Sequence, residues 1–204
     1  MSEIPPTRWE LSGNPGYGVE FSGLIEAGAD VDGEARLADA LAARGSRILD
    51  AGAGLGRIGG SLLARGHRVV AVEKDHDLVE RAARYYPDLP MVESDILGLS
   101  RDGLAALGQV AEFDLIVLVG NVIVFAAPDT EQRLLVTLRD LLADGGRILV
   151  GFHPVSRHGN ARDYPFEEFA ADVEAAGLTF QHRFGTYELH PPADDYVVAV
   201  LSVR

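Results

Sequence analysis

The stretch Ile48–Gly60, ILDAGAGLGRIGG, determines the fold of this chain. Its apolar start ends in Asp50, and three alternating glycines follow (Gly52, Gly54 and Gly56) before a helical run begins. Glycine reaches positive φ without strain and, because it lacks Cβ, lets a ligand lie against the backbone. The unpaired N–H groups of the first helical turn then face that ligand. The stretch predicts a buried strand, a tight turn and a helix N-terminus around a cofactor.

Two classes of cofactor-binding turn compete for this stretch, and their spacing separates them. The dinucleotide pattern G-x-G-x-x-G fails from Gly52, because Arg57 occupies the third glycine position, but it fits from Gly54. The pattern D-x-G-x-G-x-G fits without adjustment from Asp50 to Gly56. It resembles motif I of the class I S-adenosylmethionine-dependent methyltransferases. A glycine-rich turn without any ligand stays open on this stretch alone.

The composition is that of one cysteine-free domain. A chain of 204 residues buries about 70% of its unfolded surface, so stability requires neither a disulfide nor a metal. The absence of cysteine excludes a cysteine nucleophile. The formal net charge of −13 argues against nucleic acid as the main partner, because phosphate contacts need clustered Lys and Arg. Neither a membrane-spanning run nor a signal-like N-terminus is visible, so we expect a cytoplasmic protein without a membrane partner.

The segment ahead of the glycine loop, residues 1–44, is expected to form an arm and two helical runs. Residues 1–18 are rich in proline, glycine and polar groups, which predicts irregular structure. Asp32 is a candidate N-cap for the second run. Packing over the domain edge and closing over the cofactor as a lid are both open roles for this arm. The remaining chain, residues 45–204, forms the predicted catalytic domain.

The second apolar strand, His67–Glu73, ends in a carboxylate. Glu73 lies 19 positions beyond Gly54, close to the offset of about 20 residues at which an acid meets ribose hydroxyls. A carboxylate accepts hydrogen bonds from both hydroxyls more strongly than a neutral side chain does. Glu73 is therefore the candidate ribose ligand, and its neighbour Lys74 is a further cofactor-binding candidate. A solvated acid at the end of the strand is the alternative.

The third strand, Pro90–Glu93, is followed by Ser94, Asp95 and Ile96. An acid followed by an apolar residue at this point resembles the adenine-binding corner of the methyltransferase family. The resemblance implies that Asp95 accepts a hydrogen bond from the adenine amino group and that the backbone near Ile96 meets the ring edge. An ordinary helix N-cap is the alternative role for Asp95.

The fourth strand, Phe113–Val119, is almost entirely apolar, as expected for a central parallel strand covered on both faces. It ends in Gly120 and Asn121, which should form the floor of the site, because ligands of open α/β sheets bind outside the carboxyl ends of the strands. The turn Asp144–Gly146 is then expected to lead into a fifth strand, Arg147–Phe152.

Two strands, about Leu178–Leu189 and Asp195–Val203, finish the chain. The loop between them is short, so they must pair as an antiparallel hairpin. The predicted fold is therefore a seven-stranded, mostly parallel, doubly wound α/β sheet with an antiparallel C-terminal hairpin strand. This ending matches the class I methyltransferase sheet and differs from a doubled dinucleotide fold.

The glycine loop, Glu73, Asp95 and the terminal hairpin together resemble the class I methyltransferases in the order in which they occur. The resemblance implies a direct, SN2-like transfer of the sulfonium methyl of S-adenosyl-L-methionine, which leaves S-adenosyl-L-homocysteine. Catalysis would come mainly from alignment and exclusion of water. The cofactor-binding residues so implied are Asp50, Gly52, Gly54, Glu73, Lys74, Ser94, Asp95, Ile96, Gly120 and Asn121.

The methyl acceptor is less well defined by the sequence. The Asn/Asp-Pro-Pro-aromatic motif of base or glutamine methylation is missing after strand four, and no acidic cluster predicts a metal site. A small-molecule acceptor fits the acidic chain. His153 is the candidate general base, because an unperturbed histidine titrates near pH 6.5, and Asn121 is the second catalytic candidate. A structural or solvent-exposed His153 is the alternative.

Several questions stay open in the sequence. A polar loop after strand five could bind an anionic acceptor or be merely solvated. A non-catalytic protein that binds S-adenosylmethionine or its product is a second hypothesis for the function, and an NAD(P)-dependent oxidoreductase a third. A homodimer is also open. The acceptor-binding candidates in the polar loop are Arg157, His158, Arg162 and Tyr164.

Overall fold

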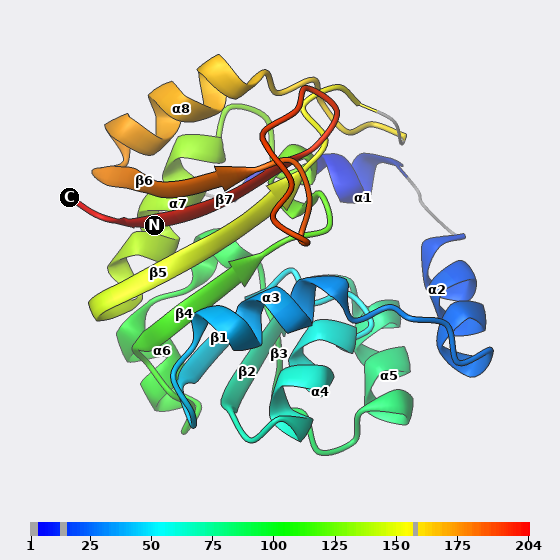
Figure 1. Cartoon of the computed structure of the whole chain (residues 1–204). Coiled ribbons are helices and arrows are strands. Elements are labelled where there is room, and N and C mark those ends of the chain that lie inside the picture. The colour runs from blue at the N-terminus through cyan, green and yellow to red at the C-terminus, as the bar shows by residue number, and fades with distance from the viewer. Residues whose placement is uncertain (1–3, 13–15, 157–158) are drawn as a thin grey trace.

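A seven-stranded sheet forms the centre of the part of the chain that the structure describes (Figure 1). The structure is a computed structural model and describes residues 4–12, 16–156 and 159–204. The strand order is β3-β2-β1-β4-β5-β7-β6, and β7 runs antiparallel to both of its neighbours while the other pairs are parallel. The strands are β1 (Arg47–Ala51), β2 (Arg68–Glu73), β3 (Met91–Glu93), β4 (Phe113–Leu118), β5 (Leu142–Phe152), β6 (Leu178–Phe184) and β7 (Val197–Val203).

Helices cover both faces of the sheet (Figure 1). Side chains that alternate along the strands pack against them. Ile48 and Leu115 pack with residues of α3 and α4, whereas Leu49 and Ile116 pack with residues of α6, α7 and α8. Full burial of one such leucine or isoleucine contributes roughly 1.5–3 kcal/mol. The helices are α1 (Arg8–Ser12), α2 (Tyr17–Glu26), α3 (Gly33–Leu41), α4 (Arg57–Ala64), α5 (His76–Tyr85), α6 (Arg101–Ala106), α7 (Glu131–Asp140) and α8 (Phe166–Ala175), with short 3₁₀ turns η1 (Ile96–Gly98) and η2 (Val122–Phe125).

The order in which the chain adds strands to the sheet reverses after β3, so that β1 and β4 lie side by side, and this reversal positions the ligand site. β1 pairs in parallel with β2 on one side and with β4 on the other. The chain winds from β1 outward to β3 and then returns across β1 to β4, so the connections diverge on the two sides. A crevice forms at the carboxyl ends of the strands at such a reversal.

The predicted fold class and the antiparallel C-terminal hairpin are confirmed. Three local predictions are wrong in whole or in part. Residues 1–18 are not irregular throughout, because α1 and the start of α2 lie within them. Asp32 occupies the N-cap position of α3, as predicted, but its side chain does not cap the helix and instead accepts a hydrogen bond from Ser61 Oγ at 3.0 Å. The first hairpin strand ends at Phe184, and Leu189 lies in the following loop with a φ of 65°.

The expected turn before the fifth strand is also different. β5 already begins at Leu142 and carries a register shift against β4, with Phe113 opposite Leu142 and Leu115 opposite Arg147. Gly145, at a φ of 73°, lies within this shift. A glycine in the left-handed conformation lets a strand bulge while it stays paired with its neighbour. The residues expected to form a turn therefore belong to β5 itself.

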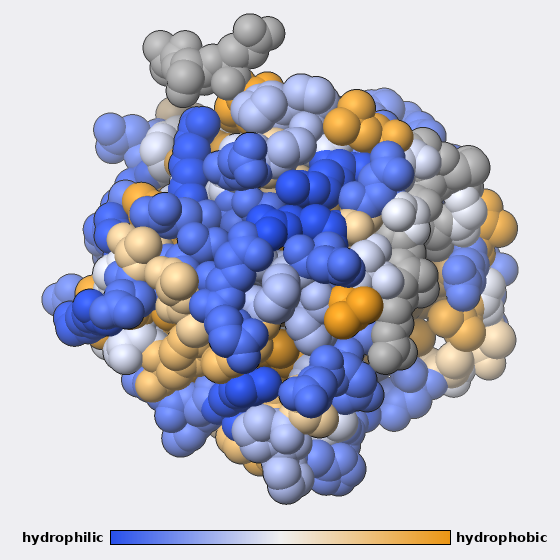
Figure 2. Space-filling model, turned by 90° about the horizontal axis from the view of Figure 1, so that it is seen from above, coloured by the Kyte–Doolittle hydropathy of each residue, from blue (hydrophilic) through white to orange (hydrophobic). Residues whose placement is uncertain are grey.

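The surface is largely hydrophilic on the face that Figure 2 shows, where hydrophobic residues form small separate patches. Within the described ranges, every helix is too short or too polar to cross a membrane.

Candidate functional site

A cavity of ≈ 660 Å³ opens at the carboxyl ends of β1, β2, β4 and β5. It lies where the strand order reverses, which is the usual ligand position in open α/β folds. Every cofactor-binding and catalytic candidate predicted from the sequence lines this cavity. They are Asp50, Gly52, Gly54, Glu73, Lys74, Ser94, Asp95, Ile96, Gly120, Asn121 and His153.

The glycine loop passes close to the opposite wall of the cavity. Gly52 has a φ of 78°, and a Cβ atom there would lie 2.6 Å from both γ-methyl groups of Val122. The N–H groups of Gly52 and Ala53 both donate to the Val72 carbonyl at 2.9 Å, which ties the loop to β2. A side chain at position 52 would therefore be strained twice, by its backbone conformation and by contact with Val122.

Asp50 is almost fully buried, with 2% of its surface exposed, and still lines the cavity. Its Oδ2 accepts a hydrogen bond from the Gly59 N–H at 2.8 Å, so the carboxyl links β1 to α4. Burial raises the pKa of Asp50 to about 7. A positive ligand group placed beside it would favour the ionised form.

Glu73 connects the glycine loop to the turn after β2. Its Oε2 accepts from the Gly54 N–H at 2.8 Å, and its Oε1 accepts from the N–H groups of Lys74 and Asp75 at 2.8 and 2.9 Å. Burial raises its pKa despite these three hydrogen bonds. Since a carboxylate has about four acceptor positions, Glu73 retains capacity for a ligand.

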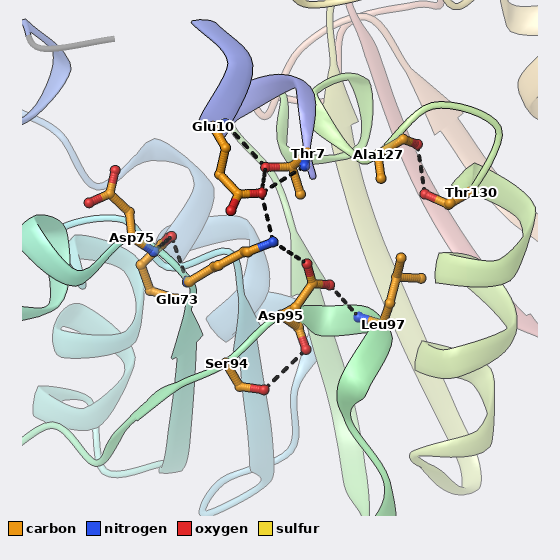
Figure 3. A network of polar contacts seen from close by, with 10 residues as sticks. Thr7, Glu10, Glu73, Asp75, Ser94, Asp95, Leu97, Ala127 and Thr130 are labelled. Atoms are coloured by element: carbon orange, nitrogen blue, oxygen red, sulfur yellow. Dashed lines mark hydrogen bonds and ion pairs between the residues drawn. The ribbon is translucent and has the colours of Figure 1, made fainter. Parts of the chain in front are cut away.

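Asp95 forms the N-cap considered for it in the sequence and also lies at the wall of the cavity. It caps η1, because its Oδ1 accepts from the Leu97 N–H at 2.8 Å, and it lines the cavity. Its Oδ2 accepts from Lys74 Nζ at 3.0 Å, within the polar network that Figure 3 shows. The neighbouring Ser94 donates through its hydroxyl to the Asp95 carbonyl at 3.2 Å. The cap and the ion pair therefore fix the orientation of the Asp95 carboxylate.

Asn121 and His153 meet at the ends of β4 and β5. Asn121 Oδ1 lies 2.8 Å from the backbone nitrogen of His153 and 3.1 Å from its Nδ1. The backbone N–H can only donate, so the Asn121 atom must be the oxygen, and Nδ1 of a neutral ring then carries the proton. This arrangement leaves Nε2 as the basic nitrogen of the imidazole.

Two tyrosines behind His153 were missed in the sequence. The rings of His153 and Tyr196 meet edge to face at 4.6 Å, and the Tyr196 and Tyr187 hydroxyls are 2.9 Å apart. Burial raises the pKa of Tyr196 to about 12, so both phenols stay neutral. Both residues lie within the loop between β6 and β7, and only the tertiary fold brings Tyr196 to the cavity. Their sequence spacing gives no signal for this position.

The arm supplies an aromatic wall that the sequence did not identify as part of the site. Trp9 of α1 lines the cavity and meets Phe125 edge to face at 5.5 Å. Its indole Nε1 donates to Asp75 Oδ2 at 2.8 Å. Arg8 donates to the buried carboxylate of Glu131 at 3.0 Å. The arm is therefore attached to both sides of the cavity.

The residues proposed for an anionic acceptor lie elsewhere. Arg162 donates to Glu131 and Glu168, and the buried Tyr164 donates to Asp172 at 2.6 Å. Neither lines the cavity, because both hold the polar loop against α7 and α8. The other two candidates, Arg157 and His158, lie outside the described residues. Within the described ranges, His and acidic side chains form no group of three or more that could hold a metal ion.

Comparisons with known proteins agree with this geometry. A family model described as a methyltransferase domain matches residues 48–146. The chain is 33% identical to a solved TehB-like S-adenosylmethionine-dependent methyltransferase from Corynebacterium glutamicum, over 95% of this chain and 100% of that one, with a TM-score of 0.80. A 1,6-didemethyltoxoflavin-N1-methyltransferase from Burkholderia thailandensis shares the fold at 20% identity, over 100% of this chain and 94% of that one, with a TM-score of 0.64.

A curated relative matches a shorter segment. Ribosomal RNA small subunit methyltransferase A from Anaeromyxobacter dehalogenans is 39% identical over 100 residues, which is 48% of this chain and 34% of that protein. The chain therefore matches only about a third of the length of this relative.

Proposed function

Since the chain belongs to the class I S-adenosylmethionine-dependent methyltransferases, we propose that it methylates a small molecule seated beside His153. The transfer is direct and SN2-like. The acceptor attacks through an oxygen or nitrogen that carries a proton, and His153 receives that proton. The relation between Asn121 and His153 carries this proposal, because it makes Nε2 the basic nitrogen at the cavity.

S-adenosylmethionine fits the residues that line the cavity. The backbone of Gly52 gives close access to the ligand, where a Cβ would meet Val122. We assign Asp50 and the glycine loop to the methionine part, Glu73 to the ribose hydroxyls and Asp95 to the adenine amino group. When bound, the cofactor supplies a methyl group on a positively charged sulfur.

The transfer balances without a further reactant. The bond between the acceptor and the methyl carbon forms as the sulfur–carbon bond breaks, and its electron pair stays on the sulfur. The acceptor proton moves to Nε2 of His153, while the Asn121 oxygen keeps the Nδ1 proton in place. General base catalysis of this kind contributes roughly 10²–10⁴-fold, and alignment of the two reactants in the cavity supplies the rest.

The charge of the cavity favours a small molecule over RNA. Its lining contains more carboxylates than cations, and the whole chain has a net charge of −13. RNA recognition relies on positive side chains facing phosphates. The lining carboxylates are Glu20, Glu34, Asp50, Glu73 and Asp95, and the lining cations are Arg57 and Lys74.

We assign residues 1–44 as a cap on the catalytic domain, residues 45–204. The contacts of Arg8 with Glu131 and of Trp9 with Asp75 support this division, because they hold α1 across the cavity. An aromatic wall close to the cofactor would help to exclude water from the transfer.

The proposal is tested by measuring the S-adenosylhomocysteine that forms when the purified chain is incubated with S-adenosylmethionine and a source of acceptor. One reaction receives a protein-free fraction of small metabolites, and a parallel one receives unmodified small-subunit ribosomal RNA. We expect turnover with metabolites only, reduced at least tenfold by His153→Ala. His190→Ala serves as the matched control, because His190 is exposed and outside the cavity. Turnover with RNA alone, or equal rates for the two variants, would overturn the proposal.

A further inference from the structure

Lys74 lies between the arm and the residue assigned to adenine. Its Nζ donates to Asp95 Oδ2 at 3.0 Å and to Glu10 Oε2 at 2.6 Å. Lys74 is the single lysine of the chain, whose other 17 of 18 basic residues are arginines. An ammonium group directs three donors from one atom, whereas a planar guanidinium favours two parallel bonds to one carboxylate. A lysine therefore suits a position that joins two separate carboxylates.

On the cofactor side, Lys74 restricts the rotation of Asp95. Leu97 holds Oδ1, Lys74 holds Oδ2, and only 12% of the Asp95 side chain is exposed. Each carboxylate oxygen has two acceptor positions, so Oδ2 can accept a ligand amino group in addition to Lys74. The ion pair thus orients the carboxylate and leaves it able to bind.

On the arm side, Lys74 binds the residue that closes the N-terminus of α1. Thr7 and Glu10 form a capping box, in which the Thr7 N–H donates to Glu10 Oε2 at 2.7 Å and the Glu10 N–H donates to Thr7 Oγ1 at 3.2 Å (Figure 3). A helix of five residues is not stable by itself in water. Lys74 therefore supports α1 and the neighbouring Trp9 at the wall of the cavity.

We propose that Lys74 is a positioning residue for the adenine end of S-adenosylmethionine. It fixes Asp95 for the adenine amino group and holds α1 beside it, without contact with the reacting atoms. The inference rests on the assignment of adenine to Asp95 in the proposed function. Loss of Lys74 then weakens recognition of the amino group specifically.

If Lys74 acted only as a positive charge, its removal would have the opposite effect on the binding of S-adenosylmethionine. S-adenosylmethionine carries one more positive charge than S-adenosylhomocysteine. Removal of a nearby cation would strengthen binding of S-adenosylmethionine relative to its product through Coulomb repulsion alone. A positioning role weakens the binding of both ligands by the same factor, because both contain the same adenine.

The test is calorimetric titration of the full chain and its variants with three ligands. These are S-adenosylmethionine, S-adenosylhomocysteine and S-inosylhomocysteine, which has an oxygen in place of the adenine amino group. For Lys74→Met we expect about tenfold weaker binding of the first two ligands and little change for the third. Arg204→Met is the matched control, since it removes an exposed ion pair with Glu174 at the C-terminus, and should leave all three affinities unchanged.

Two further variants separate this inference from the proposed function. Glu10→Gln keeps the Lys74–Asp95 pair and should cause a smaller loss, with a change in Trp9 fluorescence. Asp95→Asn should weaken S-adenosylhomocysteine at least as much as Lys74→Met does. If Lys74→Met does not fold, Lys74→Gln replaces it.

The contradicting results are equally distinct. Normal binding by Lys74→Met when Asp95→Asn binds weakly would overturn the role of Lys74 but keep the adenine assignment. If Lys74→Met binds S-adenosylmethionine more tightly and S-adenosylhomocysteine with unchanged affinity, Lys74 acts only through its charge. Unchanged affinity in Asp95→Asn would remove the adenine assignment, and the role of Lys74 with it.

Discussion

The side-chain oxygen of Asn121 accepts from both the backbone nitrogen and Nδ1 of His153, at 2.8 and 3.1 Å. Asn121 does this from a left-handed backbone conformation, with a φ of 72°, in the loop that follows β4. Asparagine tolerates this conformation better than most residues with a Cβ. One residue thus both turns the chain and selects the tautomer of the candidate base.

The first prediction concerns this pair. Asn121→Gly keeps the left-handed backbone accessible and removes the whole side chain with its accepting oxygen, so His153 loses the partner that fixes its tautomer. We expect turnover to fall at least tenfold, while the affinity for S-adenosylhomocysteine changes less than about threefold. Nitrogen NMR of the imidazole should show a mixture of tautomers. If affinity and turnover fall together, Asn121 acts on the cofactor instead of on His153.

Glu73 provides the second prediction. Glutamine keeps the shape of this side chain but turns one acceptor oxygen into an N–H₂ group, which leaves at least one backbone N–H without its partner. For Glu73→Gln we expect S-adenosylhomocysteine to bind at least tenfold more weakly, or about 1.4 kcal/mol. Glu93→Gln is the control, because Glu93 ends the neighbouring strand opposite Glu73 but is exposed. Equal affinities of the two variants would remove Glu73 from the ribose site.

The third prediction is a pH dependence that originates at Asp50. Burial raises its pKa to about 7 in the folded protein, against an ordinary value of 3.8. Between these values the folded state keeps a proton that the unfolded state has lost. Its contribution to the free energy of unfolding therefore falls as pH rises from about 4 to about 7, by a few kcal/mol at most.

Asp50→Asn should remove this slope, because asparagine does not titrate and still accepts from Gly59. Urea unfolding of both proteins at several pH values gives the difference. Parallel curves across this range would show that the pKa of Asp50 is not raised.

Gly52 provides the fourth prediction. Gly52→Ala adds strain from its positive φ, about 1–2 kcal/mol, and contact with Val122. We expect the affinity for S-adenosylhomocysteine to fall at least tenfold, and Val122→Ala in the same chain to restore part of it. Gly45→Ala is the control, since Gly45 has a φ of 73° but open space around its Cβ position. That variant should lose stability and keep its affinity; no recovery in the double variant would exclude the Val122 contact.

Local patterns made much of the fold and the cavity floor predictable. Apolar runs that end in Asp50, Glu73 and Asn121 identify parallel strands, and such strands end at one edge of the sheet. The features that were missed depend on contacts between distant segments. Tyr196 reaches His153 through the pairing of β7 with β5, and no local spacing indicates this contact.

The arm is an intermediate case. The sequence Thr7–Glu10, TRWE, contains the T-x-x-E signature of a capping box, so α1 was within reach of local rules. Its position over the cavity was not, because Lys74 and Asp75 lie more than sixty residues away in the chain. The proline and glycine content of the arm predicted irregular structure, so the short helix α1 was missed.

Because Lys74 is the chain's single lysine, a protease specific for lysine has one peptide bond to cleave, directly beside the cavity. The cut separates β1 and β2 from the other strands of the sheet. The two fragments would still share the parallel β1–β4 and β2–β3 pairings and the core between them. Cleavage at this bond would thus convert the chain into a protein of two fragments that meet at the cavity.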